Sequence, residues 1–171
     1  MKLQDLEFNK VFLIGMPFSG KTSTAKKLAK LLAWDYVDSD KEISKSENLS
    51  IDEIFVQKGE IYFRKLENSW LQDANNLSNV VISTGGGMPV FYNNIELMLH
   101  NGIVIFLNTR AQILAERSLL NNDRPLVKHV SEDLDMRMEF FNKMLFERLP
   151  YYSKAHYTLN SEAQILELFS K

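Results

Sequence analysis

One stretch of eight residues near the N-terminus constrains the fold of this chain more than any other feature. Residues 15–22 read GMPFSGKT, which fits the pattern G-x-x-x-x-G-K-[ST]. An apolar run at 11–14 precedes it, and an amphipathic stretch from Thr22 to Leu32 follows it. This order predicts a buried strand, a phosphate-binding turn and a helix, because glycines let backbone N–H groups approach an anion closely where a helix begins.

Each position of this loop has a chemical part in binding a nucleotide. Consecutive backbone N–H groups form a cradle for phosphates. The Lys21 side chain is expected to reach the β- and γ-phosphates, and the Thr22 hydroxyl to ligate Mg²⁺. The candidate nucleotide ligands are Gly15, Met16, Pro17, Phe18, Ser19, Gly20, Lys21, Thr22 and Ser23. The loop alone does not distinguish a kinase from a GTPase or an ATPase.

The rest of the chain alternates short apolar runs with longer amphipathic stretches. Strands are predicted at 11–14, 36–37, 80–83, 103–107 and 157–159. Helices are predicted at 22–32, 41–47, 51–57, 59–75, 110–120, 131–148 and 162–169. Strands that alternate with helices indicate an α/β fold with a parallel sheet. With 171 residues, no internal repeat and no linker-like segment, the chain is expected to form a single domain over 1–171.

Composition excludes several classes of protein. The 20 Lys and Arg residues nearly balance 22 Asp and Glu residues, so a general nucleic-acid binder, which needs a basic excess, is not expected. The absence of Cys excludes disulfides, thiol catalysis and zinc–thiolate sites. The apolar runs are too short to span a bilayer, and the first residues lack the apolar segment of a secretory signal. We therefore expect a cytoplasmic protein without a membrane partner.

Polar and glycine-rich segments follow two of the predicted strands. Asp38-Ser39-Asp40 ends the second strand, and Gly85-Gly86-Gly87 follows the third. Ligands of open parallel sheets bind beyond the carboxyl ends of the strands. One of the two carboxylates can face Mg²⁺ while the other accepts a hydrogen bond from a substrate hydroxyl. An Asp at this place also suits a helix N-cap. The glycines can offer unobstructed N–H groups to a substrate, although a flexible loop has the same composition.

Arginine positions are less informative by themselves. Arg64 and Glu67 are three residues apart on a predicted helix, a spacing that by itself favours an exposed salt bridge of little energetic weight. Arg124 follows the polar stretch 121–123, which suits a mobile lid. An arginine delivered by a lid can neutralise charge on a transferring phosphoryl group. The three histidines have no metal-ligand spacing.

Taken as an ordered set, the motifs from about 10 to 169 resemble the shikimate kinase family. They are the loop at 15–22, D-S-D at 38–40, S-I-D-E-I-F at 50–55, F-R-K-L-E at 63–67, S-T-G-G-G at 83–87, Arg117, R-P-L at 124–126, and Arg148 four before Tyr152. The resemblance implies transfer of the ATP γ-phosphate, with Mg²⁺, to the 3-hydroxyl of shikimate in aromatic amino acid biosynthesis. It also implies a monomer whose five-stranded parallel sheet, of order 2-3-1-4-5, lies between two layers of helices.

The resemblance assigns roles in binding the acceptor. Asp40 would hold the ring hydroxyls and polarise or deprotonate the nucleophile, while Arg64 and Arg148 would grip the carboxylate. Glu67 would orient Arg64. Backbone N–H groups of Gly85, Gly86 and Gly87 would donate to the substrate, and Ile51, Phe55 and Phe63 would form an apolar wall under the ring. The substrate-binding segment is expected near 39–67.

The resemblance also assigns roles toward the nucleotide. Asp38 would hold Mg²⁺ through water, with Thr22 as a direct ligand. Arg117 would stack on adenine. Arg124 would belong to a lid near 118–131 and, with Lys21, would act on the transferred phosphoryl group.

Two positions depart from the family pattern. The family usually has Gly where this chain has Phe18, so the bulky side chain must point away from the phosphates if the loop binds them. Asn48 stands where Gly is common, a mild change because Asn tolerates the left-handed conformation. Two alternatives stay open. One is another small-molecule kinase of the gluconate kinase or nucleoside monophosphate kinase type. The other is a nucleotide-binding module without catalysis, which only Phe18 favours.

Overall fold

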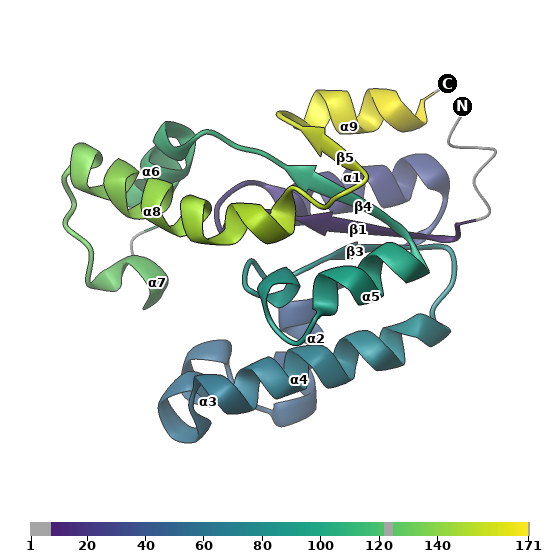
Figure 1. The fold of residues 1–171 in the computed structure, drawn as a ribbon, viewed down its shortest axis with the longest axis horizontal. Helices are drawn as coiled ribbons and strands as arrows, with labels where there is room; N and C mark the ends of the chain where they lie inside the picture. Colours follow the sequence, from purple (N-terminus) through teal and green to yellow (C-terminus); the bar gives the residue numbers. More distant parts are fainter. Residues whose placement is uncertain (1–7, 122–124, 171) are drawn as a thin grey trace.

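The five predicted strands form one parallel sheet (Figure 1). The computed structural model describes residues 8–121 and 125–170. The strands are β1 (Lys10–Ile14), β2 (Asp35–Asp38), β3 (Val80–Ser83), β4 (Ile103–Leu107) and β5 (Tyr157–Leu159). Their order across the sheet is β2-β3-β1-β4-β5 with all pairs parallel, which confirms the predicted fold class.

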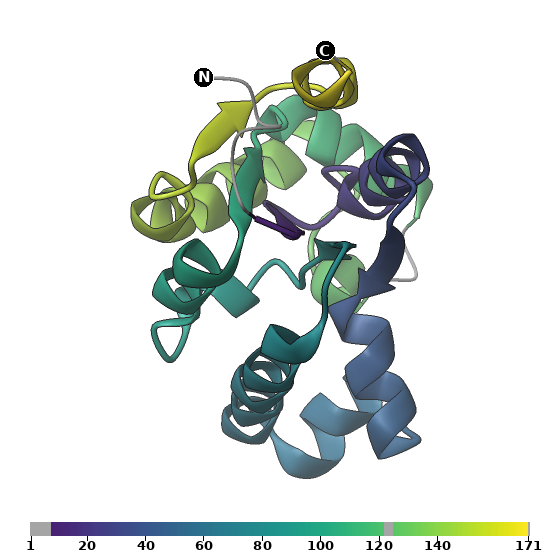
Figure 2. The same ribbon diagram turned by 90° about the vertical axis from the view of Figure 1, so that its right-hand side faces the viewer.

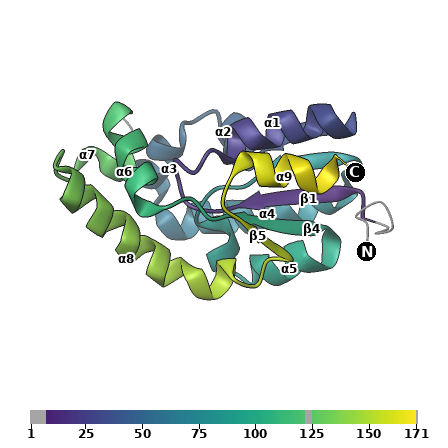
Figure 3. The ribbon, with the colours of Figure 1, turned by 90° about the horizontal axis from the view of Figure 1, so that it is seen from above.

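Helices cover both faces of the sheet. Their bounds are α1 (Lys21–Leu32), α2 (Ser39–Glu47), α3 (Ile51–Lys58), α4 (Glu60–Asp73), α5 (Asn94–Asn101), α6 (Ala111–Leu120), α7 (Pro125–Lys128), α8 (Leu134–Tyr152) and α9 (Glu162–Phe169). Figure 3 shows α1 and α9 on one face of the sheet and α5 and α8 on the other. The strands β1 and β4 are buried along their whole length, as is typical of a sheet covered on both faces.

Alternation along β1 divides the core in two. Val11 and Leu13 pack with apolar residues of α1 and α9, whereas Phe12 and Ile14 face the cluster that includes Phe141 of α8. This division follows from the strand period of two, which turns successive side chains to opposite faces.

Helices α2, α3 and α4 project to one side of the sheet (Figure 2). Ser50 caps α3: its Oγ accepts from the Glu53 N–H at 3.2 Å, and the Glu53 carboxylate accepts from the Ser50 N–H at 2.7 Å. Asn48 ends α2 with φ of 52°, the left-handed conformation that Asn tolerates. The predicted substrate-binding segment, 39–67, therefore consists of α2, α3 and the first half of α4.

The helices differ from the sequence prediction in three places. Helix α5 was not predicted, and α7 lies within the predicted lid. Helix α8 runs from Leu134 to Tyr152 instead of over the predicted range 131–148, although Pro150 lies inside it. A proline removes one backbone hydrogen bond, and in the exposed last turns of a helix water can replace that bond. Across the described residues no helix is both long enough and apolar enough to cross a membrane.

Candidate active site

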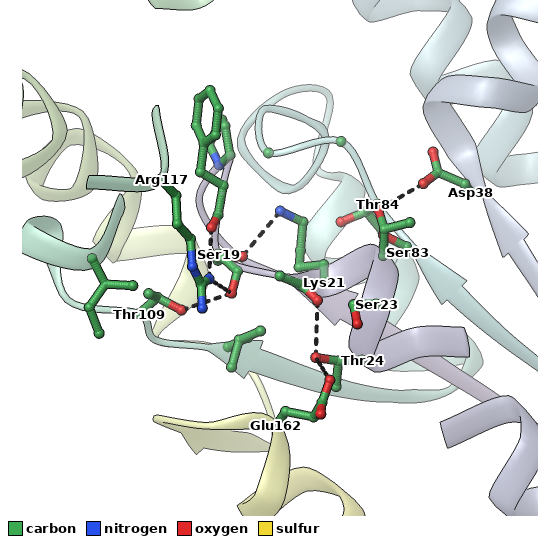
Figure 4. Close-up of a pocket in the computed structure, with 18 of the residues that line it drawn as sticks. Ser19, Lys21, Ser23, Thr24, Asp38, Ser83, Thr84, Thr109, Arg117 and Glu162 are labelled. Carbon is green, nitrogen blue, oxygen red and sulfur yellow. Dashed lines mark hydrogen bonds between the residues drawn. The ribbon is translucent and has the colours of Figure 1, made fainter. Parts of the chain in front are cut away.

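A cavity of about 880 Å³ lies at the edge of the sheet where the strands end (Figure 4). Every strand supplies a lining residue at or just beyond its last position, in chain order Pro17, Asp38, Ser83, Thr109 and Asn160. The same cavity reaches Asp40 and the glycines at 85–86. The carboxyl edge of the sheet is where a parallel α/β fold binds ligands, so the predicted phosphate loop and part of the predicted acceptor site share one cavity.

The phosphate loop has the conformation that its glycines allow. Gly20 is the N-cap of α1 with φ of 100°, and Gly15 has φ of 145°. A Cβ on Gly15 would lie 2.8 Å from the Leu107 carbonyl oxygen, closer than real Cβ contacts come. The Lys21 ammonium donates to the Met16 carbonyl at 2.8 Å and so lies over the loop. A phosphate at this helix start would meet backbone N–H groups and a lysine, which fits a nucleotide.

Side chains from α6 and from the segment between β4 and α6 hold the loop from outside (Figure 4). The Arg117 guanidinium donates to the carbonyl oxygens of Phe18 and Ser19, each at 2.9 Å. The Thr109 hydroxyl donates to the same Ser19 oxygen at 3.1 Å. Thr109 was not among the predicted site residues, and its place just after the strand predicted at 103–107 is the signal that could have indicated it. Arg117 lines the cavity, and its stacking on adenine stays a prediction.

Thr22 and Asp38, the predicted Mg²⁺ ligands, lie together. The Thr22 hydroxyl donates to Asp38 Oδ2 at 3.1 Å, and the Tyr36 hydroxyl donates to the same oxygen at 3.1 Å. Asp38 Oδ1 accepts from the Lys41 N–H at 3.3 Å, so Asp38 is a helix N-cap as well as a cavity residue. Burial, together with the charge of Asp38, raises the pKa of Tyr36 to about 12, which keeps this phenol protonated as a donor.

The hydroxyl and carboxylate oxygens of Thr22 and Asp38 are hard ligands that suit Mg²⁺. Within the described ranges, no group of three or more His, Cys, Asp or Glu residues is arranged to hold a metal. Mg²⁺ in nucleotide sites usually has one or two protein ligands and is otherwise bound by phosphates and water, and the Thr22 and Asp38 oxygens fit that small protein share.

Arg64 and Glu67 form a buried pair rather than an exposed salt bridge. Arg64 Nη1 lies 2.6 Å from Glu67 Oε2, and the two side chains are 11% and 1% exposed. Glu60 holds the other side of the guanidinium at 3.1 Å. The interpretation that spacing alone favoured, a weak surface pair, is thus wrong, because α4 packs this face against the turn at 85–87. Spacing along a helix does not reveal which face is covered.

Three aromatic rings surround the Arg64 guanidinium. Its central carbon lies 4.4 Å from the ring centroid of Phe91, 5.3 Å from that of Phe63 and 5.7 Å from that of Phe55. The rings of Phe55 and Phe63 are themselves 4.8 Å apart. Cation–π contacts of this kind stabilise a desolvated guanidinium and fix its plane. Phe91 was missed, since nothing in the sequence connects it with α3 and α4.

The three glycines at 85–87 make room for charged side chains. A Cβ on Gly87 would overlap the Arg64 guanidinium, and one on Gly85 would overlap the Asp40 carboxylate. A Cβ on Gly86 would lie 2.9 Å from Arg148 Nη1. The Gly85 N–H already donates to the buried Ser39 hydroxyl at 3.0 Å. Donation of N–H groups to a ligand therefore stays a prediction, best suited to the other two glycines.

Two buried polar atoms of this cluster lack a hydrogen-bond partner among the described residues, namely Glu67 Oε1 and Arg148 Nη1. Burial raises the pKa of Glu67 to about 7, against the opposing effect of Arg64 and with a smaller contribution from the charge of Asp40. Tyr152, one turn beyond Arg148 on α8, donates its hydroxyl to the Gly86 carbonyl at 2.6 Å. A buried acceptor and a buried donor, each without a hydrogen-bond partner among the described residues, are suited to a ligand that carries both kinds of group.

Arg124 lies outside the described residues. Its predicted action on the phosphoryl group therefore stays a prediction. The ends of the predicted lid that are described belong to α6, α7 and the turn before α8.

The parallel sheet, the phosphate loop at its carboxyl edge and the adjoining charged cluster define a nucleotide-binding α/β protein of the small-molecule kinase type. The family model described as Shikimate kinase matches residues 17–171. The chain belongs to the shikimate kinase family.

Individual relatives agree with this membership. A shikimate kinase of Bacteroides thetaiotaomicron is 35% identical over 154 residues, which cover 90% of this chain and 87% of the relative. The solved structure of the Acinetobacter baumannii shikimate kinase in complex with shikimate superposes with a TM-score of 0.85 at 30% identity, covering 95% and 93% of the two chains. A gluconokinase of Sinorhizobium meliloti, at 13% identity and a TM-score of 0.55 with 94% and 89% coverage, shares the fold alone.

Proposed function

We propose that this chain is a shikimate kinase, which transfers the γ-phosphate of ATP to the 3-hydroxyl of shikimate. One observation carries the proposal. A single cavity joins the phosphate loop to Asp40 and the glycine turn, against which the buried Glu67 and the half-buried Arg64 and Arg148 lie. A ligand with a carboxylate at one end and ring hydroxyls at the other matches guanidinium donors and a carboxylate acceptor in this order. Family membership and the shikimate complex of the Acinetobacter baumannii relative support it.

The acceptor residues divide between binding and chemistry. Arg64 and Arg148 are proposed to bind the carboxylate, since a guanidinium can form two parallel hydrogen bonds with it. The contact at 2.6 Å with Glu67 fixes the Arg64 plane. Phe55 and Phe63, which enclose this guanidinium, are proposed to lie against the apolar side of the substrate ring.

Asp40 is proposed to accept the proton of the attacking hydroxyl or to polarise it. Its carboxylate lines the cavity shared with the phosphate loop and lies against Gly85. Lys21 and the backbone of residues 15–20 are proposed to hold the phosphates, and Thr22 with Asp38 to hold Mg²⁺, which supplies positive charge at the phosphate oxygens. Arg124 is proposed to approach from the lid near 118–131 and Arg117 to contact the adenine.

An assay of ADP release with Mg·ATP tests the proposal and both alternatives. The acceptors are shikimate, gluconate, a set of nucleoside monophosphates and none. Release with shikimate alone is the expected outcome. ADP release only with gluconate or a nucleoside monophosphate would be compatible with the fold but would contradict the acceptor roles proposed for Asp40, Arg64 and Arg148. ATP binding without release for any acceptor would favour the non-catalytic module.

A monomer in the cytoplasm completes the proposal. The absence of Cys suits a reducing compartment, and no acceptor residue named above needs a second copy of the chain to complete the cavity. Size-exclusion chromatography with light scattering checks the monomer: the mass of a single 171-residue chain is expected.

A further inference from the structure

Phe18 places an aromatic ring of the phosphate loop against helix α8. Its backbone has φ of 65°, the left-handed conformation that costs a bulky residue energy. Its ring packs edge-on against Phe141 with 5.9 Å between the centroids, and Phe141 is fully buried and in turn contacts Phe140. The ring thus packs against the apolar cluster that includes Phe141, and the residue also lines the cavity.

Two separate parts of Phe18, its ring and its carbonyl group, contact other segments of the chain. The ring is held by Phe141, and the carbonyl oxygen accepts from the Arg117 guanidinium at 2.9 Å. A left-handed bulky residue persists only where its surroundings over-determine it. Here the surroundings include a ring contact on α8 and a hydrogen bond from α6, so tertiary contacts help to hold the conformation of the loop centre.

We propose that Phe18 is a positioning residue, whose ring docks on Phe141 and holds the phosphate loop in its ATP-binding conformation before the nucleotide arrives. A loop that is already ordered loses less conformational entropy on binding, so affinity rises without a new contact to the ligand. The inference rests on the proposed nucleotide site. In this proposal the Phe18 side chain positions the loop, whereas the phosphates themselves are bound by backbone groups.

Three substitutions separate the ring from the backbone conformation. Phe18→Gly removes the ring and the strain together, Phe18→Asn removes the ring but tolerates φ above zero, and Phe18→Leu keeps an apolar side chain. Calorimetry of Mg·ATP binding without acceptor is expected to show a dissociation constant about threefold to tenfold higher for Gly and Asn, with Leu in between. In steady-state assays the change is expected mainly in KM for ATP rather than in kcat.

A double-mutant cycle tests whether Phe141 is the partner. Phe141→Leu alone is expected to weaken ATP binding, and Phe18→Asn is expected to add little in that background because the contact is already lost. Phe146→Leu, at an exposed phenylalanine of the same helix, is the matched control and is expected to leave the effect of Phe18→Asn unchanged. Shikimate affinity, measured in parallel, reports any general loosening of the fold.

Two results would overturn the inference. One is equal or tighter ATP binding by Phe18→Gly, which would mean that the ring is only tolerated. The other is full additivity in the cycle with Phe141→Leu. Neither result bears on phosphoryl transfer to shikimate. Conversely, a wild-type chain that binds ATP and phosphorylates nothing would end the proposed function and leave the positioning role intact.

Discussion

The phosphate-loop end of the cavity, residues 15–22, is built from neighbours in the chain, whereas the acceptor end is built from distant segments. We define the acceptor end as Asp40, Arg64, Glu67, residues 85–87 and Arg148. Backbone groups and one lysine form the first end. Charged side chains from α2, α4 and α8, buried or half-buried, meet around the glycine turn to form the second. Binding through backbone atoms tolerates side-chain change, while binding through individual charges does not, so substitutions at the acceptor end should act on one ligand at a time.

The largest expected effect is that of Asp40→Asn. Loss of the carboxylate that receives or polarises the hydroxyl proton is expected to lower kcat by about 10²–10⁴-fold, with ATP binding retained because the loop is unchanged. ADP-release kinetics and ATP calorimetry measure the two effects. Asp52→Asn, on an exposed position of α3, is the matched control. Full kcat in Asp40→Asn would remove Asp40 from the chemistry.

Arg64→Ala is expected to have the next largest effect. Removing one partner of a buried charge pair leaves Glu67 uncompensated and takes a donor from the substrate carboxylate, so shikimate binding is expected to weaken by about 2–5 kcal/mol. Calorimetry with each ligand separately should show ATP affinity nearly intact. Arg64→Lys should not restore binding, since an ammonium cannot form the fork. Arg110→Ala, which removes an exposed arginine, is the control. If Arg64→Ala weakened ATP binding as much as shikimate binding, the proposed difference between the two ends of the cavity would be wrong.

Gly86→Ala should affect both ends, because Gly86 lies between them. A Cβ there would be 2.9 Å from Pro17 Cδ in the phosphate loop and 2.9 Å from Arg148 Nη1. Overpacking of this kind costs about 1–3 kcal/mol. The expected result is weaker binding of both ATP and shikimate in separate titrations. Weakening of one ligand alone would mean that the two ends are more independent than their contact suggests.

The smallest expected effect is a change in pH dependence with Glu67→Gln. The pKa of Glu67 is raised from 4.5 to about 7 in the folded protein. Between these values the native state binds more protons than the unfolded state, so this group's contribution to stability falls as pH rises from 4.5 to 7. Gln does not titrate. The difference in unfolding free energy, wild type minus Glu67→Gln, is therefore expected to fall across this window.

Urea unfolding at several pH values from 4.5 to 7.5 measures that difference. Glu60→Gln removes the other carboxylate that contacts Arg64, one whose side chain is 56% exposed, and is the matched control. A difference that stays constant with pH for Glu67→Gln would show that its burial does not shift its titration. This test addresses the acceptor end without any ligand.

Much of the fold was predictable because its signals are local. The apolar runs and the amphipathic stretches between them predicted all five strands, and their alternation with helices predicted a parallel sheet. The strand order came from the family resemblance, since alternation alone does not determine which strands are neighbours. Helix α5 was missed, and α8 continues through Pro150 beyond its predicted end at 148. Both errors concern short or interrupted patterns that tertiary packing supports.

The two ends of the cavity were predictable to different degrees. The phosphate loop could be assigned from residues 15–22 alone, because its chemistry needs consecutive backbone groups. By spacing alone Arg64 and Glu67 looked like a surface pair, and only the family resemblance gave them a role. The positions of Thr109, Tyr36 and Phe91 carried no sufficient signal. Thr109 and Phe91 contact residues far away in the chain, and the Tyr36 contact depends on the position of Asp38 at the end of β2.

The amino-acid sequence by itself determined the sheet-forming runs, the nucleotide loop and the balance of charge, since each depends on neighbouring residues or on composition. Tertiary structure decided which charges are buried, how the glycines at 85–87 admit them, and where the Phe18 ring lies. The physical reason is that desolvation and close contact depend on what covers a side chain. For Arg64 and Phe18 the covering groups come from other segments of the chain, which no local pattern specifies.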